Sequence, residues 1–387
     1  MQPCTIPLCV PEIAGNEWRY LKACLDGNWV SSAGPQVTAF ERGFAEWLGV
    51  GEAVAVMNGT SALHVALMLA GVKPGEEVLV SDFTFVAPVN AVRYCGALPV
   101  LVDAEPASWQ MDPALALDFL ENGCERTASG LVNRASRRRV AAILPVHILG
   151  HPVALDPILA AAAARDLPVI EDAAESLGAR LGGRALGTLG RIGCFSFNGN
   201  KLLTTGGGGM LVTDDAALAR RARYLTTQAK EPGDGGVHGE VGYNYRLTSL
   251  QAGFGQAQLE RLDALLAAKR RIAAAYADGL SGLPGIAPMP ELDGAESAFW
   301  LYTIRVDAAA AGLDAPALGR RLAARGIETR RFWQPMHLSP AHAGAQALGG
   351  AVAERLWREL LSLPSSCGLD AGTQAKVIAA LRGALGR

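Results

Sequence analysis

Seven short apolar segments between residues 53 and 213 constrain what this chain can fold into. Several of them are apolar at both odd and even positions, which is the pattern of strands that are covered on both faces. Helical stretches separate them, and this alternation predicts an α/β fold with a mainly parallel seven-stranded sheet between helices. The predicted strands span residues 53–57, 77–81, 98–103, 140–146, 167–172, 193–197 and 209–213.

The last third of the chain has a different pattern. Residues 250–280 predict one long helix, because alanine, leucine and arginine recur at helical spacing. A strand near 299–306 then precedes helices over 314–325, 351–361 and 370–385. We expect a large α/β domain with an N-terminal arm over residues 1–260 and a smaller α+β domain over residues 261–387.

Composition excludes several classes of function. The formal net charge of the 387 residues is −2, which offers no general attraction for nucleic acid. No signal peptide and no uninterrupted apolar run of roughly 18 residues is present, so we expect a cytoplasmic protein that does not enter membranes. The seven cysteines are scattered without CxxC spacing, and we expect no metal site. They are residues 4, 9, 24, 95, 124, 194 and 367.

Polar residues follow several predicted strands, at the sheet edge where α/β proteins bind ligands. Residues 58–61, with the sequence NGTS, lead directly into a helix. The free amides of a helix start, with the hydroxyls of Thr60 and Ser61 beside them, suit a phosphate. An ordinary N-cap by Thr60 or Ser61 explains the same residues. No nucleotide-binding glycine motif of the GxxxxGK[ST] or GxGxxG type is found.

Two carboxylates, Glu171 and Asp172, end a fully apolar strand. Strand side chains alternate, so only one of the two can face a ligand at the sheet edge. A carboxylate aimed at a heteroaromatic nitrogen keeps that nitrogen protonated, as pyridoxal phosphate (PLP) requires. Glu175 lies on the same side if a helix begins at Asp172.

Lys201 stands out because only six of the 35 basic residues are lysines. The other five lie in polar surroundings that suit a solvated ammonium, whereas Lys201 lies between an aromatic run and a leucine pair. Desolvation makes a lysine nucleophilic and able to form a Schiff base. A surface lysine on a turn explains this stretch equally well. Together with Asp172, the phosphate-type turn and an aromatic ring at Phe85, however, Lys201 describes a PLP site.

Seven ordered motifs resemble the DegT/StrS-type sugar aminotransferases of PLP fold type I, which is the aspartate aminotransferase-like fold. They are NGTSAL, DFTFVAPVNAVRYCGALPVLVD, PVHILGHPVALD, EDAAESLGA, FSFNGNK, TTGGGGM and GYNYRLTSLQAG. The segments GNEWRYLKACLDGNWVSSAG and FSFNGNKLLTTGGGGM further resemble the LegC-like and PglE-like branch. That branch aminates carbon 4 of UDP-linked 4-keto-6-deoxy-N-acetylhexosamines.

The resemblance implies roles for individual residues. Lys201 would form the aldimine with PLP and move protons, Asp172 would pair with the pyridinium nitrogen, and Glu175 would lie near the ring oxygen. Phe85 would stack on the ring. The phosphate would be held by Thr60, Ser61, Ser196 and, from the neighbouring subunit, Asn244.

The last of these roles implies a homodimer with shared active sites. Ser32, His147 and His337 are further candidates for contacts with the sugar or the nucleotide. A lone histidine is as often structural, but His337 has the more specific context, QPMHLSP.

The implied reaction is a ping-pong transfer of an amino group from glutamate to carbon 4 of the keto sugar. Lysine rather than histidine at position 201 disfavours the dehydrating relatives. Two alternatives remain: a GDP-perosamine synthase-like or other PLP-dependent sugar enzyme, and a regulator that binds PLP without turnover. The hexose configuration, the nucleotide and the pathway are left open by the sequence.

Overall fold

The computed structural model describes residues 6–233 and 235–386. The start of the predicted N-terminal arm, including Cys4, lies outside these residues. All seven predicted strands are present. They are β1 (Glu52–Val56), β2 (Glu77–Ser81), β3 (Leu98–Val102), β6 (Val140–Leu144), β7 (Ile170–Asp172), β10 (Ile192–Ser196) and β11 (Gly209–Thr213).

The strands pair in two four-stranded groups rather than in one ladder of seven. One group has the order β1-β11-β10-β7 and the other β16-β3-β2-β6, where β16 (Gln346–Leu348) comes from the C-terminal part of the chain. The groups adjoin at β6 and β7 through two parallel bridges, Ile143 to Val169 and Val146 to Asp172. Most pairs are parallel, but β11 is antiparallel to both of its neighbours, so the sheets are mixed.

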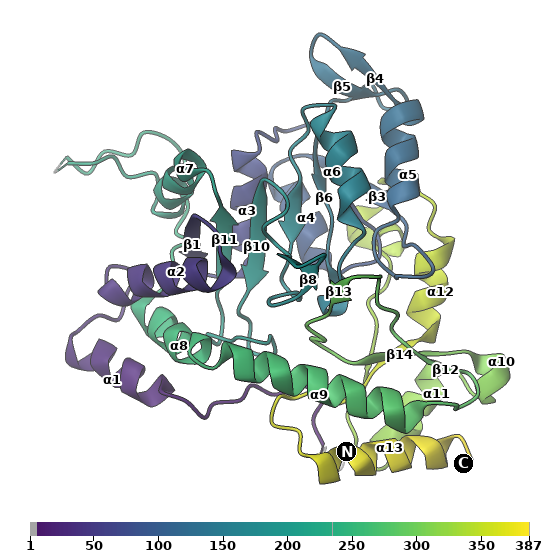
Figure 1. Ribbon diagram of the computed structural model, residues 1–387. Coiled ribbons are helices and arrows are strands. Elements are labelled where there is room, and N and C mark those ends of the chain that lie inside the picture. The colour runs from purple at the N-terminus through teal and green to yellow at the C-terminus, as the bar shows by residue number, and fades with distance from the viewer. Residues whose placement is uncertain (1–5, 234, 387) are drawn as a thin grey trace.

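Helices cover both faces of these strands (Figure 1). One face packs against α3 (Gly59–Leu69), α4 (Val86–Tyr94) and α7 (Ala216–Thr226). The other face packs against α2 (Pro35–Leu48), α5 (Pro113–Asp118) and α6 (Leu155–Ala163). In β1, for example, Val54 faces the first group of helices and Ala55 the second. Burial on both faces explains why both parities of these strands are apolar.

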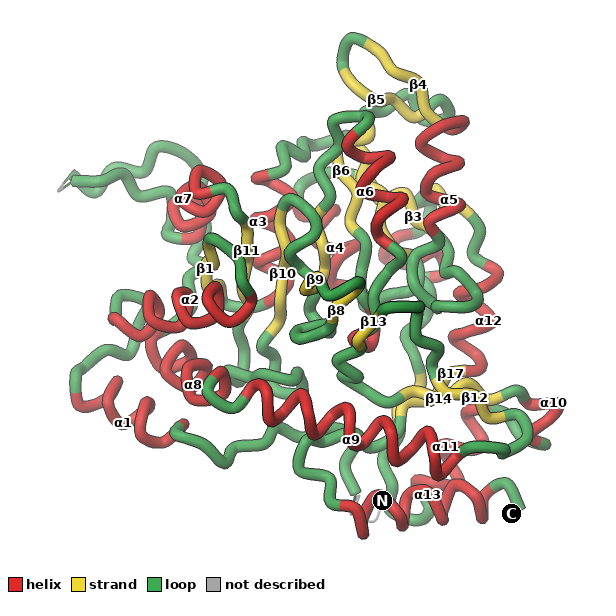
Figure 2. Tube along the Cα trace, viewed as in Figure 1, coloured by secondary structure: helices red, strands yellow, loops and turns green. Residues whose placement is uncertain are grey.

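The C-terminal part forms a second layer of helices and strands, shown by element type in Figure 2. Its sheet has the order β12-β14-β17-β15. The predicted helix over 250–280 is two helices, because the chain turns at Glu260 and Arg261. The elements are α8 (Ser249–Leu259), α9 (Leu262–Leu280), β12 (Ile286–Pro288), β14 (Thr303–Val306), α10 (Ala308–Ala311), α11 (Ala315–Ala323), β15 (Arg330–Arg331), α12 (Ala351–Glu359), β17 (Leu360–Ser362) and α13 (Ala371–Ala384).

Smaller elements complete the structure. An N-terminal helix, α1 (Glu17–Asp26), packs against α8. Two hairpins project from the strands, and one of them is extended by a strand from the C-terminal part. These elements are β4 (Cys124–Thr127), β5 (Gly130–Asn133), β8 (Arg180–Leu181), β9 (Arg184–Ala185) and β13 (Ala295–Glu296).

The predicted domain boundary at residue 260 falls between α8 and α9 and stays a prediction. Apolar side chains of α9, α11 and α13 form a core with β14 and β17. The two parts of the chain are nevertheless joined, since β16 pairs with β3. Within the described residues, no helix combines the length and the apolar character needed to cross a membrane.

Candidate active site

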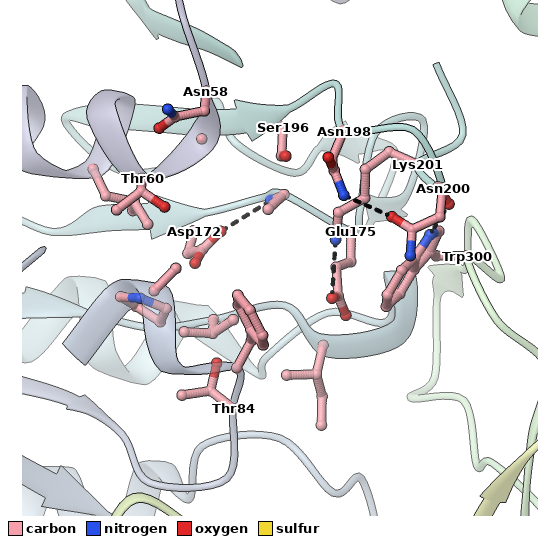
Figure 3. A pocket seen from close by; sticks show the side chains of 18 of the residues that line it. Asn58, Thr60, Thr84, Asp172, Glu175, Ser196, Asn198, Asn200, Lys201 and Trp300 are labelled. Atoms are coloured by element: carbon pink, nitrogen blue, oxygen red, sulfur yellow. Dashed lines mark hydrogen bonds and ion pairs between the residues drawn. The ribbon is translucent and has the colours of Figure 1, made fainter. Parts of the chain in front are cut away.

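A cavity of about 280 Å³ lies at the carboxyl ends of the strands (Figure 3). Residues that follow β1, β2, β7 and β10 line it, as the sequence predicted for one edge of the sheet. They are joined by three residues of the C-terminal part, Trp300, Arg330 and Trp333. Of the residues predicted to form a cofactor site, the cavity brings together Thr60, Phe85, Asp172, Glu175, Ser196 and Lys201.

Lys201 lies in this cavity and not on an exposed turn. Its side chain is 12% exposed. The amino group donates a hydrogen bond to Glu175 Oε1 at 3.1 Å and lies 3.8 Å from the ring centroid of Trp300. Because a carboxylate and an aromatic face both attract an ammonium, these two groups fix the position of Nζ.

The expectation that the other five lysines are solvated is wrong for Lys269. Its side chain is 2% exposed within α9. The sequence around it, AAKRR, has the composition of an exposed helical surface. Lys269 is buried by loops that pack against α9 and contain Cys9, Trp300 and Ser365. These loops are distant in sequence, so the residues around Lys269 do not predict its burial.

Glu171 and Asp172 point to opposite faces, as strand alternation requires. Asp172 lines the cavity, and its Oδ1 accepts a hydrogen bond from the Ala174 N–H at 3.0 Å. Burial raises the pKa of Asp172 to about 6. The chain continues in turns rather than in a helix from Asp172, yet Glu175 still reaches the cavity.

Glu171 is fully buried behind the cavity. Burial raises the pKa of Glu171, but hydrogen bonds from His147 and from the backbone of Gly190 and Gly187 outweigh it, and the net pKa is lowered. Glu171 is therefore held as a carboxylate that fixes the loop over residues 187–190.

Helix α3 begins at the cavity with Asn58 as its N-cap. Asn58 Oδ1 accepts the N–H of Ser61 at 2.8 Å, so the alternative of a cap by Thr60 or Ser61 is wrong. The first amides of a helix have no partner within the helix, and here they adjoin Thr60 and Ser196 in the cavity wall. A Cβ on Gly59 would lie 2.9 Å from Ser196 Cβ. Glycine therefore allows the close approach that forms a narrow, amide-lined recess.

Aromatic rings form another wall of the cavity. Phe85 is 49% exposed and its ring lies 5.7 Å from that of Trp333. Trp300 and Trp333 are stacked with centroids 6.4 Å apart. Next to Phe85, the Thr84 hydroxyl lines the cavity and is buried without a hydrogen-bond partner among the described residues. The Thr84 hydroxyl is therefore free to hydrogen-bond a ligand in the cavity.

The sequence reasoning missed Trp300, Trp333 and Arg330. No hydrogen bond or ion pair of the Arg330 side chain is found in the described part of the chain, so its guanidinium is available to an anion. For the two tryptophans, the sequence offered one indication of an aromatic site, the dipeptide FW at 299–300 and again at 332–333. Only the packing of the C-terminal part over the sheet edge brings them to Lys201.

Five predicted site residues do not line the cavity. His147 is fully buried, its Nε2 lies 3.0 Å from Glu171 Oε2, and its Nδ1 accepts the N–H of Val153. Nδ1 of His337 lies 2.6 Å from Asp82 Oδ2. Ser61 is buried in α3, while Ser32 and Asn244 are exposed elsewhere. In this chain, therefore, His147 holds Glu171 and is not placed to contact a sugar.

Among residues 6–233 and 235–386, no group of three or more histidine, cysteine, aspartate and glutamate side chains is arranged to hold a metal ion. The six described cysteines are free thiols. The polar groups that line the cavity include Lys201, its carboxylates and the anion recess at α3.

The chain is similar to known aminotransferases over nearly its whole length. The sequence profile of the DegT/DnrJ/EryC1/StrS aminotransferase family matches residues 11–382. The chain is 40% identical over 380 residues to EpsN of Bacillus subtilis (strain 168), named as a candidate pyridoxal phosphate-dependent aminotransferase; the match covers 97% of this chain and 95% of EpsN. It is 39% identical over 378 residues to the GDP-perosamine synthase of Caulobacter vibrioides, covering 97% of each.

A solved structure is also similar over nearly the whole chain. The aminotransferase TlmJ from Streptoalloteichus hindustanus superposes with a TM-score of 0.88 at 31% identity, covering 99% of each chain.

Proposed function

Because the chain belongs to the DegT/DnrJ/EryC1/StrS family and is a PLP-dependent sugar aminotransferase, we propose that it moves an amino group from glutamate to carbon 4 of a nucleotide-linked 4-keto-6-deoxyhexose. The observation that carries the proposal is the position of Lys201. Its amino group lies between Glu175 and Trp300, in the same cavity as Asp172 and the start of α3.

The residues of the cavity fit PLP. The recess at Gly59, Thr60 and Ser196 suits its phosphate. Asp172 offers a carboxylate that is mostly ionised above pH 6 and can hold a proton on a ring nitrogen. When bound, PLP supplies the carbonyl carbon that carries the amino group and a ring that accepts electrons.

The side chains around Lys201 would direct its chemistry. Lys201 would supply the amine that holds the cofactor, and as a general acid and base it would take a proton from one carbon and return it to another during the 1,3-proton shift. Glu175 orients Nζ, and its other oxygen is fixed by the Leu149 N–H at 2.8 Å. Phe85 and the indoles of Trp300 and Trp333 line the cavity and would limit the access of water to a bound substrate. Arg330 would bind the oxyanion of glutamate or of the nucleotide diphosphate.

The similarity to a GDP-perosamine synthase over 97% of the chain favours a GDP-linked substrate. The UDP-linked N-acetyl sugar expected from the opening segment and FSFNGNK is the second candidate. An assay of the purified enzyme distinguishes the two candidate substrates. The enzyme is incubated with glutamate and either a GDP-linked or a UDP-linked 4-keto-6-deoxy sugar, and the 2-oxoglutarate released is measured. Release with the GDP sugar alone supports the first candidate, and release with the UDP sugar alone overturns it.

A regulator that binds PLP without turnover gives no 2-oxoglutarate with either sugar. The Lys201→Ala variant is the control for the panel, because it removes the attacking amine while the rest of the cavity is kept. Turnover that survives in Lys201→Ala contradicts the proposed role of Lys201.

The proposal includes a homodimer with shared sites. Asn244 is exposed and does not line the cavity of its own chain. Its backbone forms an antiparallel β-bridge with Thr227. This position supports a role for Asn244 in the site of a neighbouring subunit, where its amide would bind the cofactor phosphate.

A further inference from the structure

Lys269 is a buried lysine to which the proposed reaction gives no role. It lies in the middle of α9 and is 2% exposed. Its amino group donates to the carbonyl oxygens of Trp300, at 2.7 Å, and Ser365, and its third neighbour is Cys9 Sγ at 3.8 Å. An ammonium has three N–H donors, and none of these three acceptors is a carboxylate. A buried cation is costly, and no ion pair of Lys269 is found among residues 6–233 and 235–386, so its presence calls for an explanation.

The group that Lys269 holds most directly is Trp300. The Trp300 N–H donates to the Leu149 carbonyl at 3.0 Å, its own carbonyl accepts from Lys269, and its indole Nε1 donates to the Asn200 carbonyl at 2.7 Å. The Asn200 carbonyl also lies 3.3 Å from Cys9 Sγ. Trp300 is thus fixed at three points, and the third is the residue that precedes Lys201.

The same indole contacts the amine of Lys201. Figure 3 shows Trp300 beside Asn200 and Lys201, and the Lys201 Nζ lies 3.8 Å from its ring centroid. Leu149 connects Glu175 and Trp300, the two residues that contact the Lys201 Nζ. Its N–H donates a hydrogen bond to the Glu175 carboxylate, and its carbonyl accepts one from the Trp300 N–H. A displacement of Trp300 would therefore move one of the two groups that locate the amine.

We propose that Lys269 is a positioning residue for Lys201 and acts through Trp300, by anchoring the carbonyl of the tryptophan whose indole faces the Lys201 amine. The proposal rests on the proposed role of Lys201 as the cofactor-binding amine. The hydrogen-bonding groups of Lys269, and not its charge alone, produce the effect.

Two substitutions of Lys269 distinguish the effect of its hydrogen bonds from the effect of its positive charge. Lys269→Gln removes the charge but keeps N–H donors for the carbonyls of Trp300 and Ser365, whereas Lys269→Met has a similar length and no donor. Arg271→Met is the matched control on α9, because Arg271 is exposed and its guanidinium donates to the Leu369 carbonyl, away from Trp300. Trp300→Leu provides the background in which the tryptophan is absent.

The first measurement is the pH midpoint of the visible absorbance change of each holoenzyme, which reports the proton on the Lys201 nitrogen. Glu175, Asp172 and Arg330 are the other charged groups of this cavity and are unchanged in every variant. A well-placed aromatic face favours the cationic nitrogen, so the midpoint of Lys269→Met is expected to lie about half a pH unit below that of Lys269→Gln. We expect kcat of Lys269→Met to be about tenfold lower at little-changed KM for glutamate.

In the Trp300→Leu background, the difference between Lys269→Met and Lys269→Gln should vanish. Equal midpoints for the two variants with Trp300 present, or a difference that persists without Trp300, overturn the proposal. If Lys269→Met does not fold, kcat of Lys269→Gln tests the proposal instead. A kcat within about twofold of the wild-type value supports the positioning role, whereas a tenfold lower kcat shows that the charge of Lys269 is needed and overturns the proposal.

Borohydride reduction of the wild-type holoenzyme, followed by peptide mapping, keeps this test separate from the proposed function. An adduct on a residue other than Lys201 contradicts the proposed function. Equal behaviour of the two Lys269 variants with the adduct on Lys201 contradicts the positioning role alone.

Discussion

Asp172 and Glu171 are neighbours in one strand, and their surroundings give them opposite properties. Glu171 is surrounded by hydrogen-bond donors that stabilise its charge, whereas Asp172 accepts one backbone hydrogen bond in a buried position. The pKa of Asp172 therefore rises from its ordinary 3.8 to about 6. Because burial outweighs the attraction of the nearby Lys201, the ionised form of Asp172 destabilises the folded chain.

Asp172→Asn is therefore expected to stabilise the cofactor-free protein while it impairs the enzyme. A raised folded-state pKa means that the contribution of Asp172 to stability is fully present below pH 3.8 and is lost as the pH rises to about 6. The loss corresponds to about 3 kcal/mol at most. Urea unfolding of wild type and Asp172→Asn, both without cofactor, should give a stability difference that grows between pH 4.5 and 7 and then levels off.

The control for this measurement is Asp156→Asn, which changes an exposed carboxylate paired with Arg184. It should show no such rise. If the stability of Asp172→Asn relative to wild type is the same at pH 4.5 and pH 8, the burial argument for Asp172 is wrong. Activity of Asp172→Asn should be strongly reduced, because an amide cannot hold a proton on the ring nitrogen.

The position of the start of α3 depends on how closely this helix approaches β10. Gly59 has no Cβ, and an added methyl would lie 2.9 Å from Ser196 Cβ. Since β10 is held between β7 and β11, the helix start would have to move. The recess formed by Gly59, Thr60 and Ser196 would then change its shape.

Gly59→Ala is therefore expected to lower the affinity for PLP by at least about tenfold and to cost about 1–3 kcal/mol of stability through overpacking. Titration of the cofactor-free protein with PLP and urea unfolding measure the two effects. Gly383→Ala in α13 is the matched control, because its added methyl would meet only the flexible end of Arg325; it should be neutral or slightly stabilising. Unchanged PLP affinity in Gly59→Ala would show that α3 does not bind the phosphate.

The sequence predicted elements best where burial alone determines them. Strands such as β2 are covered on both faces and carry a continuous apolar signal. The break between α8 and α9 was missed, because Glu260 and Arg261 are residues that helices accept and the turn is set by packing. The position of Asp172 at the end of β7 could be predicted for the same reason as the strands, whereas Glu175 reaches the cavity through turns and not through the helix that the sequence predicted. The positions of Trp300 and Lys269 could not be predicted, since distant loops decide them.

An exposed apolar surface of the molecule adjoins the start of α3. Met57 is 41% exposed and Tyr94 57% exposed, next to the polar Asn58. Exposed large apolar side chains of this kind favour a subunit contact. A neighbouring subunit there would place its own residues, including the proposed Asn244, near the phosphate recess.

Mixing two inactive variants tests whether the sites are shared. Lys201→Ala and Asn244→Ala would each be inactive, the second through loss of phosphate binding. After exchange of subunits, half of the dimers contain one intact site, so about a quarter of the wild-type activity should return. Mixing Lys201→Ala with Asp172→Asn is the control: both residues belong to one cavity, and no activity should return. No recovery in the first mixture would contradict a shared site.

Lys201 is proposed to be the amine that attaches to PLP. Borohydride treatment of the purified holoenzyme, followed by digestion and mass spectrometry, identifies the lysine that holds the cofactor. We expect a reduced cofactor adduct on the peptide that contains Lys201 and none in Lys201→Ala. An adduct on the more deeply buried Lys269, or an adduct that persists in Lys201→Ala, would show that Lys201 is not this amine.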